Sequence, residues 1–213
     1  MLDLDPYVQS WMTVLAEQRP LFHSESDFQL ALGLILADQG LTQLRLEKKM
    51  SVSQPIGGRS SIYVDVLGEL NGHRVALELK YPKRHLHTCV GREVFDLPAS
   101  GAPDIDAAAI WRDAQRIERL LLDNTVDVGA SLTLTNYRFW SERSMTVRSQ
   151  AHQFRLWEGR TVEPGTLRWQ LKNGRQGEQF ELQSAYQCRW HDFGDVCDYG
   201  FRYLLLQPRL RPQ

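Results

Sequence analysis

The sequence is short of cysteine and of long hydrophobic runs. Its 213 residues include three cysteines with no CxxC spacing, so we expect reduced thiols and not a disulfide framework (Cys89, Cys188 and Cys197). The apolar run LALGLILA at 30–37 is far too short to cross a bilayer. The acidic start MLDLDPYVQSW lacks the basic and apolar regions of an export signal. These absences predict a cytoplasmic protein with no membrane partner.

An excess of charge of either sign is also missing. The chain has 25 Lys and Arg against 26 Asp and Glu, a formal net charge of −1, so any nucleic-acid site must be a local basic patch. With 42% hydrophobic and 24% charged residues the composition is that of a globular protein and excludes a disordered one. We expect a single domain over residues 1–213, with a core at about 20–137 and a β-rich C-terminal elaboration at about 138–213.

Hydrophobic periodicity predicts both helices and strands. The helices are expected at 5–18, at about 24–40 and at 104–123. Strands are expected in the first two thirds of the chain at 42–50, 61–70, 73–80 and 128–137. Short strands between Gly and Pro turns are expected in the tail at 165–171, 177–183, 186–193 and 201–207.

Three local features refine these expectations. Two capping boxes, Ser24 with Asp27 and Ser26 with Gln29, open the second helix. This helix is apolar over most of its circumference after Phe28, which predicts packing on both sides. Residues 51–60 are interpreted as a turn-rich break, and 81–103 as a long connection that is either functional or partly helical.

The hairpin YVDVLGELNGHRVALELK at 63–80 places an unusual set of charges in a run that otherwise predicts two strands. Asn71-Gly72 between two alternating runs predicts a two-residue type I′ turn, so facing residues have numbers that sum to 143. In this register Asp65 faces Glu78, and Lys80 lies two residues further on the same face. The other face is apolar and is expected to pack on the core (Ile62, Val64, Val66, Val75, Leu77 and Leu79).

Two carboxylates in directly facing positions destabilise a hairpin unless one takes up a proton or a cation lies between them. A hard divalent ion such as Mg²⁺ is a suitable cation, because it prefers carboxylate oxygens and keeps several waters. The alternative is a solvated polar face of a two-stranded ribbon, in which Lys80 pairs with Asp65 or Glu78.

The acidic residue on one strand and the Glu78-Leu79-Lys80 tripeptide on the next resemble the motif of the PD-(D/E)XK nuclease superfamily. The resemblance covers about residues 20–137 and implies an α/β fold with a mixed central sheet and a restriction-endonuclease-like α-β-β-β-α-β core. Val64 stands where the motif's name has a proline, which members often lack. The family's helical Glu corresponds to Glu25, and the helix with Gln115 and Arg116 is expected to pack beside the site.

The resemblance implies a Mg²⁺- or Mn²⁺-dependent endonuclease or nickase, acting on nucleic acid and on DNA in particular, in DNA processing or defence. Asp65 and Glu78 would hold the ion, Glu25 would complete or orient its shell, and Lys80 would stabilise developing negative charge. Because the chain lacks a broad basic surface, a homodimer or a protein partner is expected to help hold the substrate.

Other residues near the motif are candidates for support. Lys83, Arg84 and His85 follow the ExK strand as a basic loop that either binds phosphates or is simply solvated. His23 either touches the site or makes a local bond at the helix start. Arg116 is expected to pair with Asp113 within its helix. The tail tryptophans are expected in the core rather than stacked on bases (Trp140, Trp157, Trp169 and Trp190).

Two other functions stay open at this stage. One is a catalytically inactive member of the fold that binds nucleic acid or protein, because fold and function are separate claims. The other is a metal-dependent enzyme that acts on a smaller phosphodiester or nucleotide. A closed pocket over the charged cluster would favour the small substrate, and an open basic groove would favour a nuclease.

Overall fold

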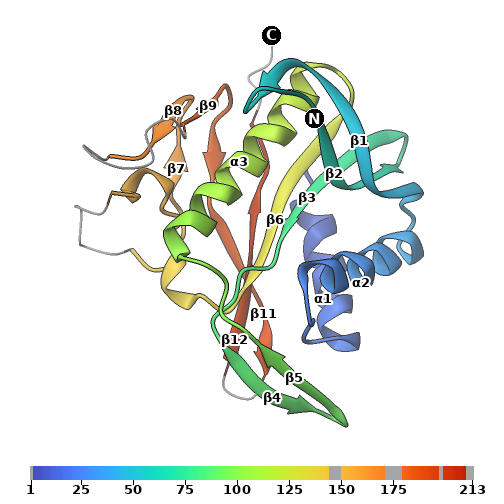
Figure 1. Ribbon diagram of the computed structural model, residues 1–213. Helices are drawn as coiled ribbons and strands as arrows, with labels where there is room; N and C mark the ends of the chain where they lie inside the picture. The colour runs from blue at the N-terminus through green and yellow to red at the C-terminus, as the bar shows by residue number, and fades with distance from the viewer. Residues whose placement is uncertain (1, 144–149, 171–178, 197–198, 210–213) are drawn as a thin grey trace.

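The computed structural model describes residues 2–143, 150–170, 179–196 and 199–209. Within these residues the largest sheet has six strands in the order β1-β2-β3-β6-β12-β11 (Figure 1). β3 and β6 are parallel and the other neighbours are antiparallel, which confirms an α/β fold with a mixed central sheet. The strands are β1 (Thr42–Ile56), β2 (Arg59–Leu70), β3 (His73–Lys80), β6 (Val128–Thr135), β11 (Arg189–Val196) and β12 (Tyr199–Leu206).

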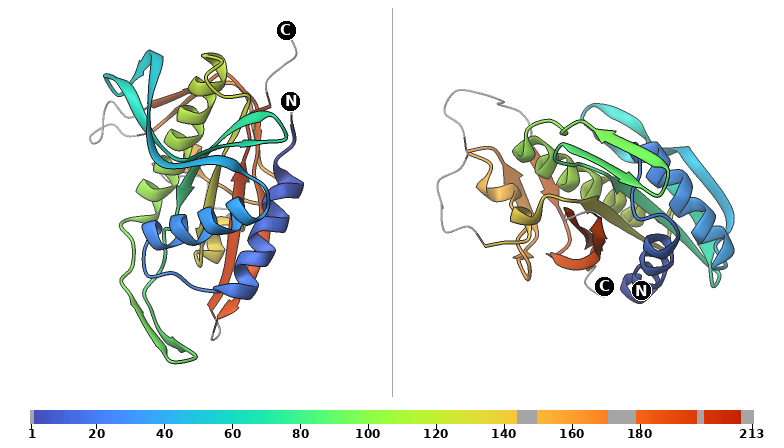
Figure 2. Two further views of the ribbon diagram at one scale, coloured as in Figure 1. Left: turned by 90° about the vertical axis from the view of Figure 1, so that its right-hand side faces the viewer. Right: turned by 90° about the horizontal axis from the view of Figure 1, so that it is seen from below.

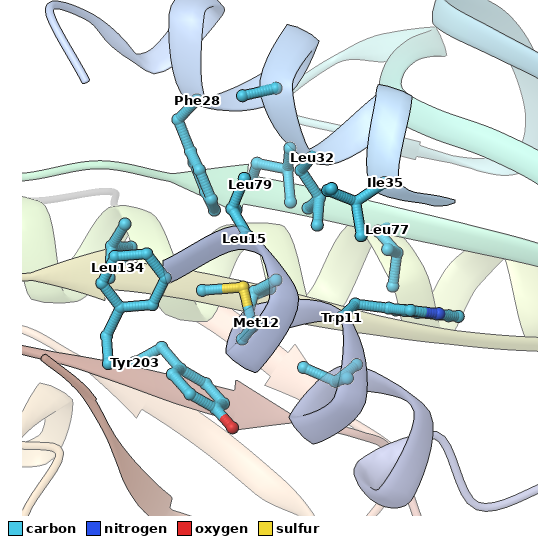
Figure 3. Close-up of a cluster of buried hydrophobic side chains, with 14 of the residues drawn as sticks. Trp11, Met12, Leu15, Phe28, Leu32, Ile35, Leu77, Leu79, Leu134 and Tyr203 are labelled. Atoms are coloured by element: carbon cyan, nitrogen blue, oxygen red, sulfur yellow. The ribbon is translucent and has the colours of Figure 1, made fainter. Parts of the chain in front are cut away.

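Helices cover both faces of this sheet (Figure 2). α1 (Asp5–Gln18) and α2 (Glu25–Asp38) pack on one face, where Trp11, Phe28 and Leu32 meet Leu77 and Leu79 of β3 (Figure 3). α3 (Pro103–Leu122) packs on the other face. All three helices lie where the periodicity predicts them. Among the described residues, there is no helix with the length and apolarity that crossing a membrane requires.

The prediction that α2 is packed on both sides is wrong. Leu30 and Leu34, one helical turn apart, are 53% and 65% exposed. α2 is an outer helix whose inner face alone contacts α1 and the sheet, so its apolar residues extend beyond the buried stripe. Its start is as predicted at Ser24, whose hydroxyl accepts a hydrogen bond from the backbone N–H of Asp27.

Two predicted connections are strands instead. β1 continues through the expected break to Ile56, and Gly57 and Gly58, with φ of +56° and +77°, make the turn into β2. Positive φ is costly for other residues, so two glycines permit a tight turn there. The region 81–103 contains a β-hairpin, β4 (Leu86–Val90) and β5 (Glu93–Leu97), which projects from the body as an arm (Figure 1).

The C-terminal part is rich in strands, as predicted, and it continues the central sheet because β12 pairs with β6. Its other elements are short: 3₁₀ turns at Arg138–Trp140 and His152–Phe154, and β7 (Thr161–Val162), β8 (Gly165–Arg168), β9 (Gln179–Leu182) and β10 (Tyr186–Gln187). Trp140 and Trp190 are buried in its core, and Trp169 packs against it. Cys197 and parts of the predicted strands at 165–171 and 177–183 lie outside the described residues.

Glu118 ties this C-terminal part to α3. Its fully buried carboxylate accepts hydrogen bonds of 2.7 Å from the backbone N–H groups of Gln183 and Ser184, and one of 3.4 Å from the Tyr186 hydroxyl. A carboxylate satisfied in this way can be buried without a counter-cation. The position of α3 on the sheet therefore depends on residues 183–186.

Candidate functional site

The β2–β3 hairpin has the turn and the register that the sequence predicts. Asn71 and Gly72 both have positive φ, +51° and +78°, as a type I′ turn requires. Leu70 pairs with His73, and the ladder continues to Val66 and Leu77. The register therefore brings Asp65 and Glu78 to the next pair of positions.

The two strands separate at Asp65. In this register the backbone N–H of Leu79 would bond to the carbonyl of Val64, but it donates instead to Oδ2 of Asp65 at 2.6 Å. Gln29 of α2 donates to the backbone carbonyl of Asp65 at 2.7 Å. Glu47, opposite Asp65 on β1, has a φ of +52°, which interrupts the regular strand. Asp65 thus lies in the opening between the two strands, with its carboxylate bonded to β3 and its backbone carbonyl bonded to α2.

The predicted single apolar face of the hairpin is divided at this opening. Val66 and Leu77 belong to the core under α1 and α2, whereas Ile62 and Val64 pack in a second core with Ile117 and Leu120 of α3. The irregular backbone at positions 47 and 65 accounts for the change, because alternation of faces requires a regular strand.

The charged face of the hairpin is not solvated, because α3 covers it. The Glu78 side chain is 0% exposed and the Asp113 side chain only 3%. Nη1 of Arg116 lies 3.2 Å from both Glu78 Oε2 and Asp113 Oδ1, so the pair expected within the helix also reaches the sheet. Among the described residues, no donor forms a hydrogen bond to either carboxylate oxygen of Glu78. The ribbon alternative, a polar face in water, is therefore excluded.

Lys80 and Glu25 complete the cluster. Nζ of Lys80 lies 3.1 Å from Asp113 Oδ2 and 3.5 Å from Glu25 Oε1, and it donates to the carbonyl of Leu79. Oε2 of Glu25, at the first position of α2, accepts a hydrogen bond from the backbone N–H of Tyr81. Six residues thus form one carboxylate cluster: Glu25, Asp65, Glu78, Lys80, Asp113 and Arg116.

Burial changes the acidity of this cluster. Burial raises the pKa of Asp65 to about 6, and the N–H of Leu79 and the charge of Lys80 offset only part of that effect. Burial, followed by the charges of Asp113 and Asp65, raises the pKa of Glu78 well above its ordinary value. Burial alone would lower the pKa of Lys80, but Asp113, Glu25 and Asp65 together outweigh it and raise that pKa. Lys80 is therefore a cation at neutral pH.

The cluster fits a divalent cation by its charge and by its oxygen atoms. When ionised, its four carboxylates exceed its two cations by two charges, and both buried oxygens of Glu78 have no hydrogen-bond partner in the part of the chain that the structure describes. Within the described part of the chain, no three His, Cys, Asp or Glu side chains form a ready-made metal site. Mg²⁺ needs only one or two carboxylates and completes its shell with waters. Asp65 and Glu78 are the residues that would hold Mg²⁺ or Mn²⁺.

The supporting residues predicted around the motif have mixed outcomes. His23 does not reach the cluster, because it stacks on Phe95 of the arm at 4.4 Å and its Nε2 lies 2.8 Å from Glu93. Gln115 donates to the carbonyl of Glu181 and lies in a neighbouring groove. Arg116 is part of the cluster itself. The helix after the hairpin therefore does pack over the site.

The basic loop after β3 does not form a single patch. Lys83 lies 4.8 Å from the ring centre of Tyr81, and partial burial lowers its pKa while Glu25 opposes that effect. The exposed Arg84 is held by its backbone N–H, which donates to Asn136. His85 lies 3.6 Å from Asp96 across the arm. Lys83 is therefore close enough to Glu25 to interact with its charge.

Gln29 was missed by sequence reasoning, which gave it to a capping box with Ser26. Its side chain instead joins Asp65 and Glu47, with 3.0 Å to Oε1 of Glu47. The available signal was its spacing of four from Glu25, which places both residues on the inner face of α2.

Comparison of the chain with protein-family models, with curated proteins and with solved structures finds no match.

Proposed function

We propose that this chain is a Mg²⁺-dependent nuclease that hydrolyses phosphodiester bonds, with DNA as its expected substrate. The observation that carries the proposal is the meeting of Asp65, Glu78 and Lys80 with Glu25 at the point where β2 and β3 separate. These are the positions that the resemblance to PD-(D/E)XK nucleases selects. The order α2, β1, β2, β3, α3, β6 also supports the resemblance, with the β4–β5 arm as an insertion.

Asp65 and Glu78 would hold the divalent ion, which would supply Lewis acidity and lower the pKa of a bound water. The protein's own groups have separate tasks. Lys80, held protonated by three carboxylates, is suited to stabilise negative charge on the phosphoryl oxygens. Glu25, whose side chain is 47% exposed, is the carboxylate best placed to accept a hydrogen bond from the attacking water. Asp113, whose Oδ2 lies 3.1 Å from Nζ of Lys80, orients the Lys80 ammonium group from α3.

The test is cleavage of supercoiled plasmid DNA, single-stranded DNA and RNA by the purified chain with Mg²⁺, Mn²⁺ or EDTA. We expect metal-dependent cutting that falls about 100-fold or more in Asp65→Asn, Glu78→Gln and Lys80→Met, the range for removing a metal ligand or a charge-stabilising group. Glu69→Gln is the matched control, because Glu69 lies on β2 like Asp65 but close to the turn. Absence of metal-dependent cutting on all three substrates, or equal activity in Asp65→Asn, would refute the proposal.

One observation favours the second candidate, a catalytically inactive binding module. Arg116 lies 3.2 Å from a completely buried Glu78, so a protein cation already compensates one proposed metal ligand. The two candidates differ in calorimetric titration with Mg²⁺. A nuclease should bind Mg²⁺ and lose that binding in Glu78→Gln, whereas the inactive module should bind none in either form.

A further inference from the structure

A groove of about 850 Å³ lies beside the carboxylate cluster. Its walls come from the turn between β1 and β2, the outward side of α3 and the start of β9. Arg116 belongs to both places, since it lines the groove and lies 3.2 Å from Glu78. Nη2 of Arg116 also donates to the carbonyl of Tyr63, another lining residue. Arg116 therefore connects the groove to the cluster.

The groove collects positive charge in a chain whose acidic residues outnumber its basic ones by one. Lys49, Arg59, Arg112 and Arg116 line it, and among its described lining residues there is no Asp or Glu. With a net charge of −1 for all 213 residues, this is the local basic patch that a nucleic-acid site needs. It is not the patch that the sequence predicts, because these residues come from three separate elements and meet only in the folded chain.

We infer that this groove binds the phosphate backbone of a nucleic-acid strand and leads it to the carboxylate cluster. The inference rests on the proposed function for the identity of its occupant. Phosphates next to Arg116 would lie beside Glu78, which is where hydrolysis is proposed to occur. Guanidinium groups match phosphate oxygens in pairs, and each neutralised phosphate releases condensed counterions.

The groove favours nucleic acid over an acidic peptide because it also offers an aromatic surface. Tyr63 is 54% exposed although it is a large side chain, and a base can stack on it. The guanidinium of Arg112 lies 5.6 Å from the ring centre of Phe180, which holds it along the wall. Ser60 and Ser61 add neutral donors of the kind that bind phosphate oxygens. A peptide of Asp and Glu would use the cations but not the exposed ring.

The test measures binding without cleavage, by fluorescence anisotropy of labelled 20-mer single-stranded and duplex DNA in EDTA. We expect Lys49→Gln, Arg59→Gln and Arg112→Gln each to weaken binding about 5- to 10-fold and to reduce the slope of log K against log salt by about one. Lys48→Gln is the control, because Lys48 is exposed, neighbours Lys49 in β1 and is not a lining residue. Tyr63→Ala should weaken single-strand binding further than duplex binding.

The outcomes separate this inference from the proposed function. If the three variants bind as Lys48→Gln does, the groove is not the binding surface, even if the chain cuts DNA. If poly-glutamate displaces the oligonucleotide at equal charge concentration, the groove is a site for acidic protein and the inference fails. If the wild-type chain binds DNA through the groove but does not cut it with Mg²⁺, the inference about the groove is supported and the nuclease proposal fails. Circular dichroism of each variant confirms that the fold is retained.

Discussion

Nζ of Lys80 lies 3.1 Å from Oδ2 of Asp113, and this ion pair joins the end of β3 to the middle of α3. Asp113 is buried, so its negative charge has no water to stabilise it and depends on Lys80 and Arg116. Lys80 in turn compensates three carboxylates at once. The cluster is therefore one electrostatic unit in which the loss of a single charge affects every member.

Replacement of Lys80 by Met should destabilise the protein strongly at neutral pH. It leaves Glu78 and Asp113 with Arg116 alone, and breaking a buried ion pair from one side costs on the order of 3 kcal/mol. The loss should shrink at pH 5, where the buried acids take up protons more easily. Urea unfolding at pH 7.5 and pH 5 measures both effects, with the exposed Lys48→Met as the control. Equal losses in the free energy of unfolding at the two pH values would contradict the electrostatic coupling of Lys80 to the buried acids.

The stability of the metal-free protein should fall as pH rises through about 6. The folded-state pKa of Asp65, about 6, lies above its ordinary 3.8, so the folded chain binds this proton more tightly than the unfolded chain does. The resulting stabilisation is complete below about pH 4 and is lost as pH rises through 6, a change on the order of 2 kcal/mol. Asp65→Asn removes this titration. In thermal melts in EDTA, the melting temperature of Asp65→Asn minus that of the wild type should increase from pH 4 to pH 8.

The same titration predicts how Mg²⁺ acts on stability. Asp65 must lose its proton to bind a cation, so 10 mM Mg²⁺ should raise the melting temperature of the wild type more at pH 8 than at pH 5. Asp65→Asn should show little rise at either pH. A rise of the same size in both proteins would place the ion elsewhere on the molecule.

Replacement of Gln29 by Ala should impair cleavage more than folding. Gln29 holds the backbone carbonyl of Asp65 from α2, so its loss lets the carboxylate move, while only about 1–3 kcal/mol of hydrogen-bond stability is removed. We expect about a 10-fold or greater drop in kcat with an unchanged affinity for DNA in EDTA. The exposed neighbour Leu30 supplies the control, Leu30→Ala. A positioning role fails if kcat stays at the wild-type value.

Replacement of Gly129 by Ala should displace α3 from the sheet. An added Cβ would lie 2.8 Å from Cγ2 of Ile117 and 2.9 Å from the backbone carbonyl of Ala76, both too close. We expect destabilisation of about 1–3 kcal/mol, as for other overpacked core positions. Gly101→Ala is the matched control, because nothing lies within 4 Å of its Cβ. Chemical unfolding that gives equal values for both variants would show that α3 tolerates the shift.

The sequence predicts the hairpin at the site well because its rules are local. Asn71-Gly72 sets the turn, the turn sets the register, and the register places Asp65 near Glu78 without any knowledge of the fold. The three helices are predicted for the same reason, since each has its own apolar stripe. The exposure of Leu30 and Leu34 is missed because an apolar helix face says nothing of whether a neighbour covers it.

The sequence does not predict which cations belong to the site, because that depends on how distant elements meet. Lys83, Arg84 and His85 are neighbours of the motif in sequence, yet each has a different contact: Lys83 with Tyr81, Arg84 with Asn136 and His85 with Asp96. Arg59 and Arg112 are 53 positions apart and line one groove. The sequence predicts a turn-rich break at 51–60. It therefore predicts neither the full length of β1 nor the groove beside the Gly57-Gly58 turn.

The bonds of Glu118 have a consequence for the order in which the site forms during synthesis. α3 carries Asp113 and Arg116, but Glu118 anchors it to residues 183–186, and β6 acquires its second neighbour only from β12. A growing chain on the ribosome has Asp65, Glu78 and Lys80 long before it has these partners. The carboxylate cluster is therefore completed late in translation, and a chain that stops short of residue 183 lacks the residues that anchor α3 over Glu78.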